Sequence, residues 1–379
     1  MSFQLTEEQK MVRLMAKDFA RKELEPEAAR RDKEEIFPTE VVKKMGQLGL
    51  LGMMVPVEYG GVGASTVSYS LALQEIAYSC ASTAVTMSVA NLSTEPLLKF
   101  GNENQKTKYL VGLAQGKLLG CFALTEPGAG SDPGSLSIRA EDKGDYYLIN
   151  GTKIFITHGQ YADVVNLITR TGQEKGSKGL TAFIVEKGTP GFSIGTREDK
   201  MGLRASNTVE LLFDDCRVPK ENLIGKEGIG FKIAMTALDS GRIGIASQAI
   251  GITRACLDES IRYAKERRQF GKTISSFQAI QWMIADMATG LEAANLLTLS
   301  AAWRKDHKMP FTKEASMAKL FASELANKSA YLALQIHGGY GYLKDFKVER
   351  LYRDARATSI YEGTSEIQRL VIARDLLKD

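Results

Sequence analysis

Residues 227–267 read EGIGFKIAMTALDSGRIGIASQAIGITRACLDESIRYAKER and contain no proline. Eight of the nine prolines in the chain lie at or before Pro219, and only Pro310 follows. Since a proline inside a helix costs ~3 kcal/mol, the region after Pro219 can form long helices. The stretch 227–267 is therefore expected to be one long helix.

Helix-breaking residues divide the chain beyond this stretch. They are Gly271-Lys272-Thr273, Lys308-Met309-Pro310 and the cluster Gly338-Gly339-Tyr340-Gly341. The segments between them predict further helices at 274–306, 312–337 and 363–377. Together with the first helix they favour a four-helix bundle in a C-terminal helical domain, residues 227–379.

The first part of the chain also carries helix signals. Thr6-Glu7-Glu8-Gln9 has the pattern of a capping box. Met11, Met15 and Phe19 then recur at the spacing of one helix face. We expect an N-terminal helical domain at residues 1–120.

The middle of the chain, residues 121–226, has a different pattern. Short runs rich in β-branched and aromatic residues occur at 147–149, 153–156, 163–169, 180–185 and 209–213. Turn signals such as Asn150-Gly151 and the segment 187–191 separate them. The predicted fold is therefore mainly α, with a central β-barrel or β-sandwich domain between two helical domains.

Composition excludes several classes of protein. The 379 residues are 44% hydrophobic and 25% charged, which are ordinary globular values. The net charge of +4 is small, and basic residues interleave with acids as in Lys265-Glu266-Arg267-Arg268, unlike the basic blocks of nucleic-acid binders. No apolar run approaches the ~20 residues that span a bilayer, and we expect no membrane partner.

Cysteine and histidine usage predicts neither metal sites nor disulfides. The four cysteines are scattered without a CxxC pair, and none of the three histidines stands at metal-ligand spacing to another. The N-terminus lacks the basic and apolar regions of a secretory signal. A reducing compartment is expected, either the bacterial cytoplasm or, for a processed chain, the mitochondrial matrix.

Three glycine clusters could be taken for nucleotide-binding loops. Residues 60–63 and 225–230 lack the full GxGxxG spacing and do not lie in a βαβ unit. The sequence therefore does not favour a nicotinamide-binding Rossmann domain. The third cluster, FALTEPGAGSD at 122–132, is apolar first and then small, which lets backbone N–H groups approach an anionic ligand.

Several motifs together resemble the acyl-CoA dehydrogenase family. They are FALTEPGAGSD at 122–132, FIT at 155–157, RRQFG at 267–271, QIHGG at 335–339 and YEGTSEIQ at 361–368. They occur in the family's order across essentially the whole chain. The stretch from 238–244 to the C-terminus most resembles the short-chain, butyryl-CoA members.

The resemblance implies FAD as cofactor and a set of residues around it. Phe122, Leu124, Thr125 and Ser131 would line the flavin ring and pyrophosphate. Phe155 and Thr157 would lie against the isoalloxazine ring, with the Thr157 hydroxyl on flavin N5, and Ile156 between them would also bind the cofactor. Thr364 and Glu366 would also contact FAD. The residues implied to hold the ADP half of a neighbouring subunit's flavin, which in turn implies a homotetramer, are Arg267, Phe270, Gln278, Gln335, Gly338 and Gly339.

The resemblance also implies an acyl-CoA site formed by Ser131, Asp239, Arg242 and Gly363. The acyl tail would lie near residues 86–92 and Ile243. Two positions depart from the family pattern: Phe155 stands where many members have Trp, and His158 where Asn is common. A phenyl ring can still stack on a flavin, and a lone histidine is more often structural than catalytic.

The implied chemistry needs a base and a hydride acceptor. No side chain accepts hydride, so a cofactor must. A carboxylate can remove the α-proton near neutral pH once an apolar pocket raises its pKa. The resemblance implies Glu362 in this role, and it implies that a Gly363 N–H can stabilise enolate charge by ~3 kcal/mol. The family's other base position corresponds to Gly241, which cannot serve.

The expected activity is oxidation of a short acyl-CoA to the trans-2-enoyl-CoA, with electrons passing to electron-transfer flavoprotein. Butyryl-CoA is the expected substrate, while branched, cyclic and dicarboxylic short acyl groups stay open. An acyl-CoA oxidase is disfavoured because those relatives are usually longer. A DNA-associated flavoprotein on the same fold would need a concentrated basic surface, which the sequence lacks.

Overall fold

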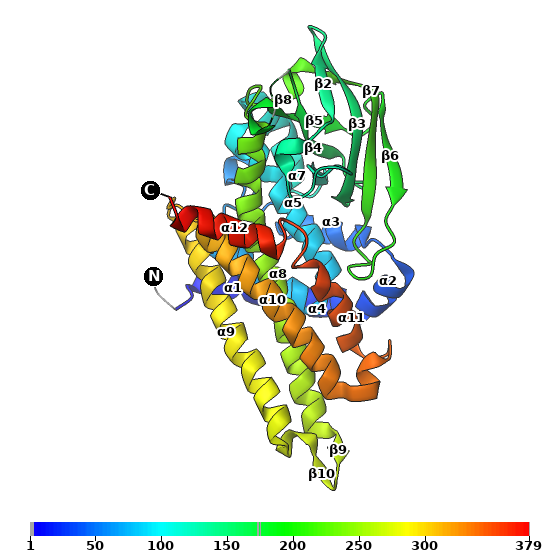
Figure 1. Ribbon diagram of the computed structural model, residues 1–379, viewed down its shortest axis with the longest axis vertical. Coiled ribbons are helices and arrows are strands. Elements are labelled where there is room, and N and C mark those ends of the chain that lie inside the picture. Colours follow the sequence, from blue (N-terminus) through cyan, green and yellow to red (C-terminus); the bar gives the residue numbers. More distant parts are fainter. Residues whose placement is uncertain (1–3, 173, 175, 379) are drawn as a thin grey trace.

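The computed structural model describes residues 4–172, 174 and 176–378, and it is built from an upper β-rich part and a long helical part (Figure 1). The N-terminal helices are α1 Glu7–Phe19, α2 Ala28–Glu34, α3 Thr39–Gln47, α4 Thr66–Ser79, α5 Ala81–Phe100, α6 Glu103–Gln105 and α7 Val111–Ala114. The predicted capping box is confirmed: the Thr6 side chain accepts from the Gln9 N–H, and the Gln9 side chain accepts from the Thr6 N–H.

The middle of the chain forms one eight-stranded sheet, in the order β6-β7-β3-β2-β4-β5-β8, with β1 paired in parallel to β4. Buried residues of these strands, such as Ile149, Leu167 and Phe183, form its core. The strands are β1 Gly120–Ala123, β2 Arg139–Asp142, β3 Tyr146–Thr157, β4 Val164–Arg170, β5 Leu180–Glu186, β6 Phe192–Arg197, β7 Thr208–Pro219 and β8 Leu223–Ile224.

The turn predicted at Asn150-Gly151 is wrong. Both residues lie inside the continuous strand β3, where the register with β7 shifts between Ile149 and Gly151. Gly151 has φ +141°, and a Cβ there would lie 2.8 Å from a side-chain carbon of Ile138. The Asn150 side chain bonds to Asp215 on β7 instead of closing a turn. The same residue pair that favours hairpin turns therefore makes a β-bulge here.

The C-terminal region contains α8 Gly230–Glu266, α9 Gln278–Asp306, α10 Thr312–His337, α11 Lys347–Ala357 and α12 Ser365–Leu376. A short hairpin, β9 Arg268–Gln269 with β10 Lys272–Thr273, follows α8 where the helix break was predicted. Helix α11 was not predicted; it forms because Val348, Leu351 and Ala355 bury one face of a single helix.

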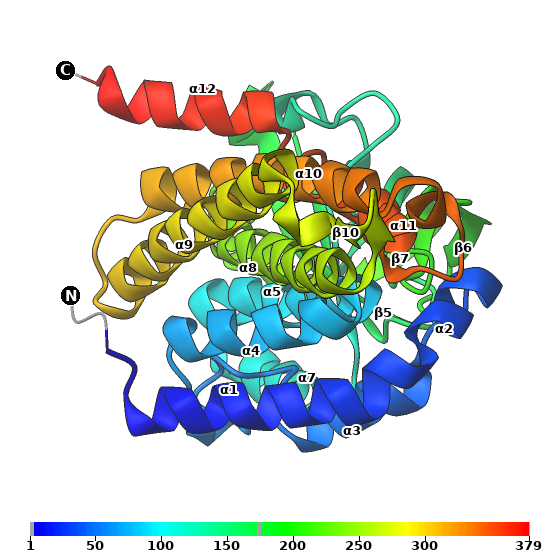
Figure 2. The ribbon, with the colours of Figure 1, turned by 90° about the horizontal axis from the view of Figure 1, so that it is seen from below.

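The two helical regions are packed as layers against each other. Figure 2 shows α1 outermost, then α4 and α5, then α8, with α9 and α10 beyond it. The Ser70 and Ser247 hydroxyls are 2.7 Å apart, and Gln248 donates to the Ala81 carbonyl, 2.8 Å. These contacts join α4 and α5 to α8, so the long helix lies at the centre of the molecule.

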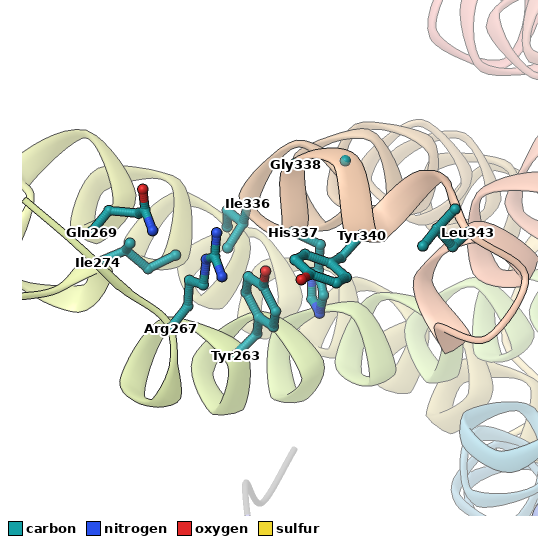
Figure 3. Close-up of a pocket in the computed structure, with 10 residues that line it drawn as sticks. Tyr263, Arg267, Gln269, Ile274, Ile336, His337, Gly338, Tyr340 and Leu343 are labelled. Atoms are coloured by element: carbon teal, nitrogen blue, oxygen red, sulfur yellow. The ribbon is translucent and has the colours of Figure 1, made fainter.

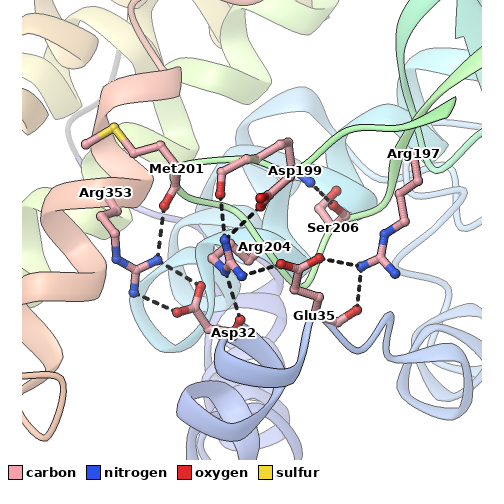
Figure 4. A network of polar contacts seen from close by, with 9 residues as sticks. Asp32, Glu35, Arg197, Asp199, Met201, Arg204, Ser206 and Arg353 are labelled. Atoms are coloured by element: carbon pink, nitrogen blue, oxygen red, sulfur yellow. Dashed lines mark hydrogen bonds and ion pairs between the residues drawn. The ribbon is translucent and has the colours of Figure 1, made fainter.

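A network of ion pairs joins the three regions and fixes α11 (Figure 4). Arg353 on α11 pairs with Asp32 of the N-terminal region at 2.6 Å. Arg204, from the loop between β6 and β7, pairs with Glu35. The Leu203 N–H of that loop donates to Asp354 at 2.6 Å. The segment that follows α11 therefore begins from a firmly held helix.

No described helix is both long and apolar enough to cross a membrane. In the described part of the chain no cluster of His, Cys, Asp or Glu could hold a metal ion. The four cysteines are buried and free.

Candidate active site

Glu362 lies in a tight turn between α11 and α12. Its φ of +52° and the φ of +91° at Gly363 are both left-handed. Gln368 on α12 donates to the Gly363 carbonyl at 2.9 Å and to the Glu362 carbonyl at 3.2 Å. Lys319 on α10 donates to the same Gly363 carbonyl at 2.7 Å. The surrounding helices thus hold a backbone conformation that is uncommon for a glutamate.

The Glu362 carboxylate is buried and has no hydrogen-bond partner in the described part of the chain. Both of its oxygens are out of contact with solvent, and neither has a partner among the residues that the structure describes. Burial raises the pKa of Glu362 to about 7, although Lys319 and Arg242 act in the lowering direction. A carboxylate with this pKa can take up a proton near neutral pH.

The buried Arg242 pairs with the half-buried Asp239 on α8, next to this carboxylate. Their side chains are 2.6 Å apart, and Asp239 also accepts from Thr312 on α10 at 2.5 Å. Arg242 is 3% exposed, and its Nε has no partner in the described chain. An unpaired buried donor is costly, which is consistent with a polar ligand atom being bound here.

Lys319 is a residue of this site that sequence reasoning missed. It is fully buried in the middle of α10, and burial lowers its pKa to about 8. Its contacts place it against the turn that carries Glu362. No sequence signal marks it, because a lysine within a predicted helix normally lies on the solvated face.

A second group of predicted residues gathers at one end of the sheet. Phe122 lies at the end of β1, and the loop that follows carries Leu124, Thr125 and Ser131. The Ile154 N–H of β3 donates to the Thr125 carbonyl at 2.9 Å, so the FIT segment lies beside this loop.

The three residues of the FIT segment differ in exposure. Phe155 has φ +58° and is 59% exposed, while Thr157 is half-buried. The Ile156 side chain packs in the sheet core, so it presents only backbone atoms to the outside. His158 is buried, and its Nε2 lies 2.7 Å from the Gly120 carbonyl. Burial lowers the pKa of His158 to about 4, which makes it a neutral structural residue.

A third group lies at the end of the helical part that carries β9 and β10 (Figure 1), and Figure 3 shows it from close by. An open hollow of about 570 Å³ is lined there by Arg267, Gly338, Gly339, Tyr340 and neighbouring side chains. The Arg267 guanidinium lies 5.4 Å from the Tyr340 ring centre. The remaining predicted residues of this group, Phe270, Gln278 and Gln335, are exposed near the same helix ends.

The third group is distant from Glu362. Arg242 lies inside α8, and Arg267 caps the C-terminal end of that helix 25 residues further along the sequence. At 1.5 Å per residue this separates them by roughly 37 Å. Thr364 and Glu366, in contrast, follow Glu362 directly and line a second open hollow of about 580 Å³.

Comparison with known proteins matches the chain to one family along its length. The description "Acyl-CoA dehydrogenase, N-terminal domain" matches residues 6–117, "middle domain" matches 121–216, and "C-terminal domain" matches 228–377. The mitochondrial short-chain specific acyl-CoA dehydrogenase of Rattus norvegicus is 53% identical over all of this chain and 92% of its own length.

Two solved structures share the whole fold. Butyryl-CoA dehydrogenase from Megasphaera elsdenii has a TM-score of 0.98 and 45% identity, with 100% of both chains covered. A chain in the structure of the electron transferring flavoprotein of Acidaminococcus fermentans has a TM-score of 0.99 and 49% identity, again with 100% of both chains covered.

The chain therefore belongs to the acyl-CoA dehydrogenase family, and it is an oxidoreductase with that family's three-domain fold. Its similarity to short-chain specific and butyryl-CoA dehydrogenases confirms the resemblance drawn from its motifs.

Proposed function

We propose that this enzyme oxidises short acyl-CoA thioesters to trans-2-enoyl-CoA with FAD as cofactor and Glu362 as base. The observation that carries the proposal is the buried Glu362 carboxylate, unpaired in the described chain and with its pKa raised to about 7. An unpaired buried carboxylate is costly to the fold, so a role in proton transfer accounts for its presence here.

In the proposed reaction the substrate loses one proton from C2 and one hydride from C3. Glu362 removes the α-proton, and the electron pair of that C–H bond becomes part of the C2–C3 double bond. Hydride leaves C3, and FAD supplies the acceptor for its two electrons. The Gly363 N–H is proposed to stabilise negative charge on the thioester oxygen. Arg242, Asp239 and Ser131 are proposed to bind the acyl-CoA.

The second group of residues, formed by the loop after β1 and the FIT segment 155–157, fits a flavin. Phe155 offers an exposed aromatic ring for stacking. A Cβ on Gly128 would meet no atom within 4 Å, and one on Gly130 would reach only Thr125 at 4.0 Å. The loop therefore leaves its backbone open to an anionic group such as a pyrophosphate. Phe122, Leu124, Thr125 and Thr157 are proposed to complete this site, together with the Ile156 backbone, Thr364 and Glu366.

The third group is proposed to bind the ADP half of FAD from another subunit. A separation of roughly 37 Å along α8 puts it beyond the flavin site of its own chain. A homotetramer with dihedral symmetry would bring two such ends together. Electron-transfer flavoprotein is proposed as the electron acceptor, supported by the similar chain in the Acidaminococcus fermentans structure.

A substrate panel tests the proposal. The purified protein should show flavin absorbance, and kcat/KM with an artificial electron acceptor should be highest near butyryl-CoA and fall steeply by octanoyl-CoA. Each methylene that does not fit costs ~1–3 kcal/mol. Isobutyryl-, cyclohexanecarboxyl- and glutaryl-CoA test the branched, cyclic and dicarboxylic alternatives. A protein without flavin, or without activity on any acyl-CoA, would contradict the proposal.

A further inference from the structure

A buried ion pair lies between the two segments that are proposed to contact the flavin. The Lys153 ammonium is 2.8 Å from a Glu126 carboxylate oxygen, and these side chains are 0% and 3% exposed. A buried ion pair rarely adds stability over an apolar pair of similar size. The presence of this pair in the interior therefore points to a role other than stability.

Glu126 fixes the shape of the loop that follows β1. One carboxylate oxygen accepts from the N–H and the hydroxyl of Ser137, at 2.6 and 2.7 Å. The backbone of Glu126 exchanges two hydrogen bonds of 3.1 Å with Ala129, which closes the turn Glu126–Ala129. With Lys153 on its other oxygen, this carboxylate is fully hydrogen-bonded.

Lys153 ties the same loop to the FIT segment. Its ammonium also donates to the Leu124 carbonyl at 2.7 Å. Just beyond Lys153, the register of β3 with β7 shifts before Ile156. This bulge turns the exposed Phe155 outward with its left-handed φ. The buried pair thus lies at the base of the bulge, two residues from the ring that is proposed to stack on the flavin.

We propose that Lys153 and Glu126 are positioning residues that hold segments 122–131 and 153–157 in register with each other and thereby set the affinity for FAD. This inference rests on the proposed flavin site. It assigns no contact between either residue and the cofactor. Burial lowers the pKa of Lys153 to about 8, so the ammonium is still largely charged at neutral pH.

Three variants of the holoenzyme test the proposal, with FAD dissociation followed by the rise of free-flavin fluorescence on dilution and unfolding followed by thermal denaturation. Lys153→Met should raise the dissociation constant of FAD by about tenfold or more, as expected for a lost charge-assisted hydrogen bond. It should also lower the unfolding temperature, because the buried Glu126 loses its cation.

The double variant Lys153→Met/Glu126→Gln separates positioning from stability. It leaves no unpaired buried charge, so the unfolding temperature should recover toward that of the wild type. The dissociation constant of FAD should stay raised, because the bond to the Leu124 carbonyl is still missing. If Lys153→Met does not fold, the dissociation constant of FAD from the double variant alone tests the positioning role.

Arg254→Met is the control at another buried carboxylate. It removes one of the two arginines that lie 2.7 Å from Glu75, namely the one that joins α8 to α4, and leaves Arg13 in place. It should lower the unfolding temperature and leave FAD affinity unchanged. Wild-type FAD affinity in the double variant would overturn the positioning role. A wild-type protein that binds no FAD would instead overturn the flavin site itself, so the two failures are distinguishable.

Discussion

A Cβ added to Gly241 would lie 1.9 Å from the Oε2 atom of Glu362. Helix α8 therefore approaches the carboxylate so closely that only glycine leaves room for it. The family resemblance implies a second possible base position, and in this chain that position is Gly241. Because Gly241 has no side chain, it leaves room for the side chain of Glu362.

Gly241→Ala tests this relationship. The added methyl group meets the flexible end of Glu362, so the carboxylate should move while the fold persists. A misplacement of about 1 Å can lower catalysis by roughly a hundredfold, and we expect a loss of kcat of that order with FAD content unchanged.

Gly290→Ala is the control for this variant. Its Cβ would lie 2.5 Å from the end of the Leu325 side chain, which is also flexible, and its nearest neighbours include no atom of Glu362. We expect wild-type turnover from it. Equal kcat for the Gly241 and Gly290 variants would show that the contact with Glu362 has no catalytic consequence.

The pH dependence of turnover follows from the raised pKa of Glu362. A general base acts only when it is ionised, so kcat/KM should fall as the pH drops through about 7, the value to which burial raises this pKa in the free enzyme. The measurement is kcat/KM for butyryl-CoA across the neutral range. A profile that stays flat down to the ordinary range of a glutamate pKa would contradict the burial argument.

Lys319→Met should shift that profile. The Lys319 charge lowers the pKa of Glu362, so its removal should move the acidic limb toward higher pH, by roughly one unit. Gln368 still donates to the Gly363 carbonyl at 2.9 Å, so the turn should persist. A shift toward lower pH, or no shift, would show that Lys319 acts only through its hydrogen bond.

The proposed homotetramer predicts that FAD is retained only in the oligomer. Arg267 is proposed to bind a flavin whose ring lies in another subunit, so Arg267→Ala should reduce FAD content without altering Glu362. Light scattering with flavin absorbance on the same peak should find FAD only in the oligomer. A fully flavinated monomer would refute the shared site.

Much of the fold could be predicted from local sequence. The absence of proline from 227–267 predicts α8, and the runs at 147–149 and 153–156 predict β3. Asn150-Gly151 misleads because its backbone preference suits a bulge as well as a turn, and only the pairing with β7 distinguishes them. Helix α11 went unpredicted because its apolar face is short and surrounded by charged residues.

Less of the site than of the fold could be predicted from the sequence. The family motifs mark Glu362, Phe155 and Arg242, but the buried lysines 153 and 319 carry no local signal. Whether a lysine is solvated or buried depends on packing between segments distant in the sequence. The contact of Gly241 with Glu362 likewise joins residues 121 positions apart and depends on how α8 packs against the turn before α12.

Glu362→Gln provides the most direct measurement of the proposed chemistry. The amide preserves the shape of the side chain and removes its basicity. Under anaerobic conditions in a stopped-flow instrument, butyryl-CoA should still bind and perturb the flavin absorbance. The rate of flavin bleaching should fall by roughly a thousandfold or more relative to the wild type. Bleaching at a rate near that of the wild type, with full FAD content, would remove Glu362 from the reaction.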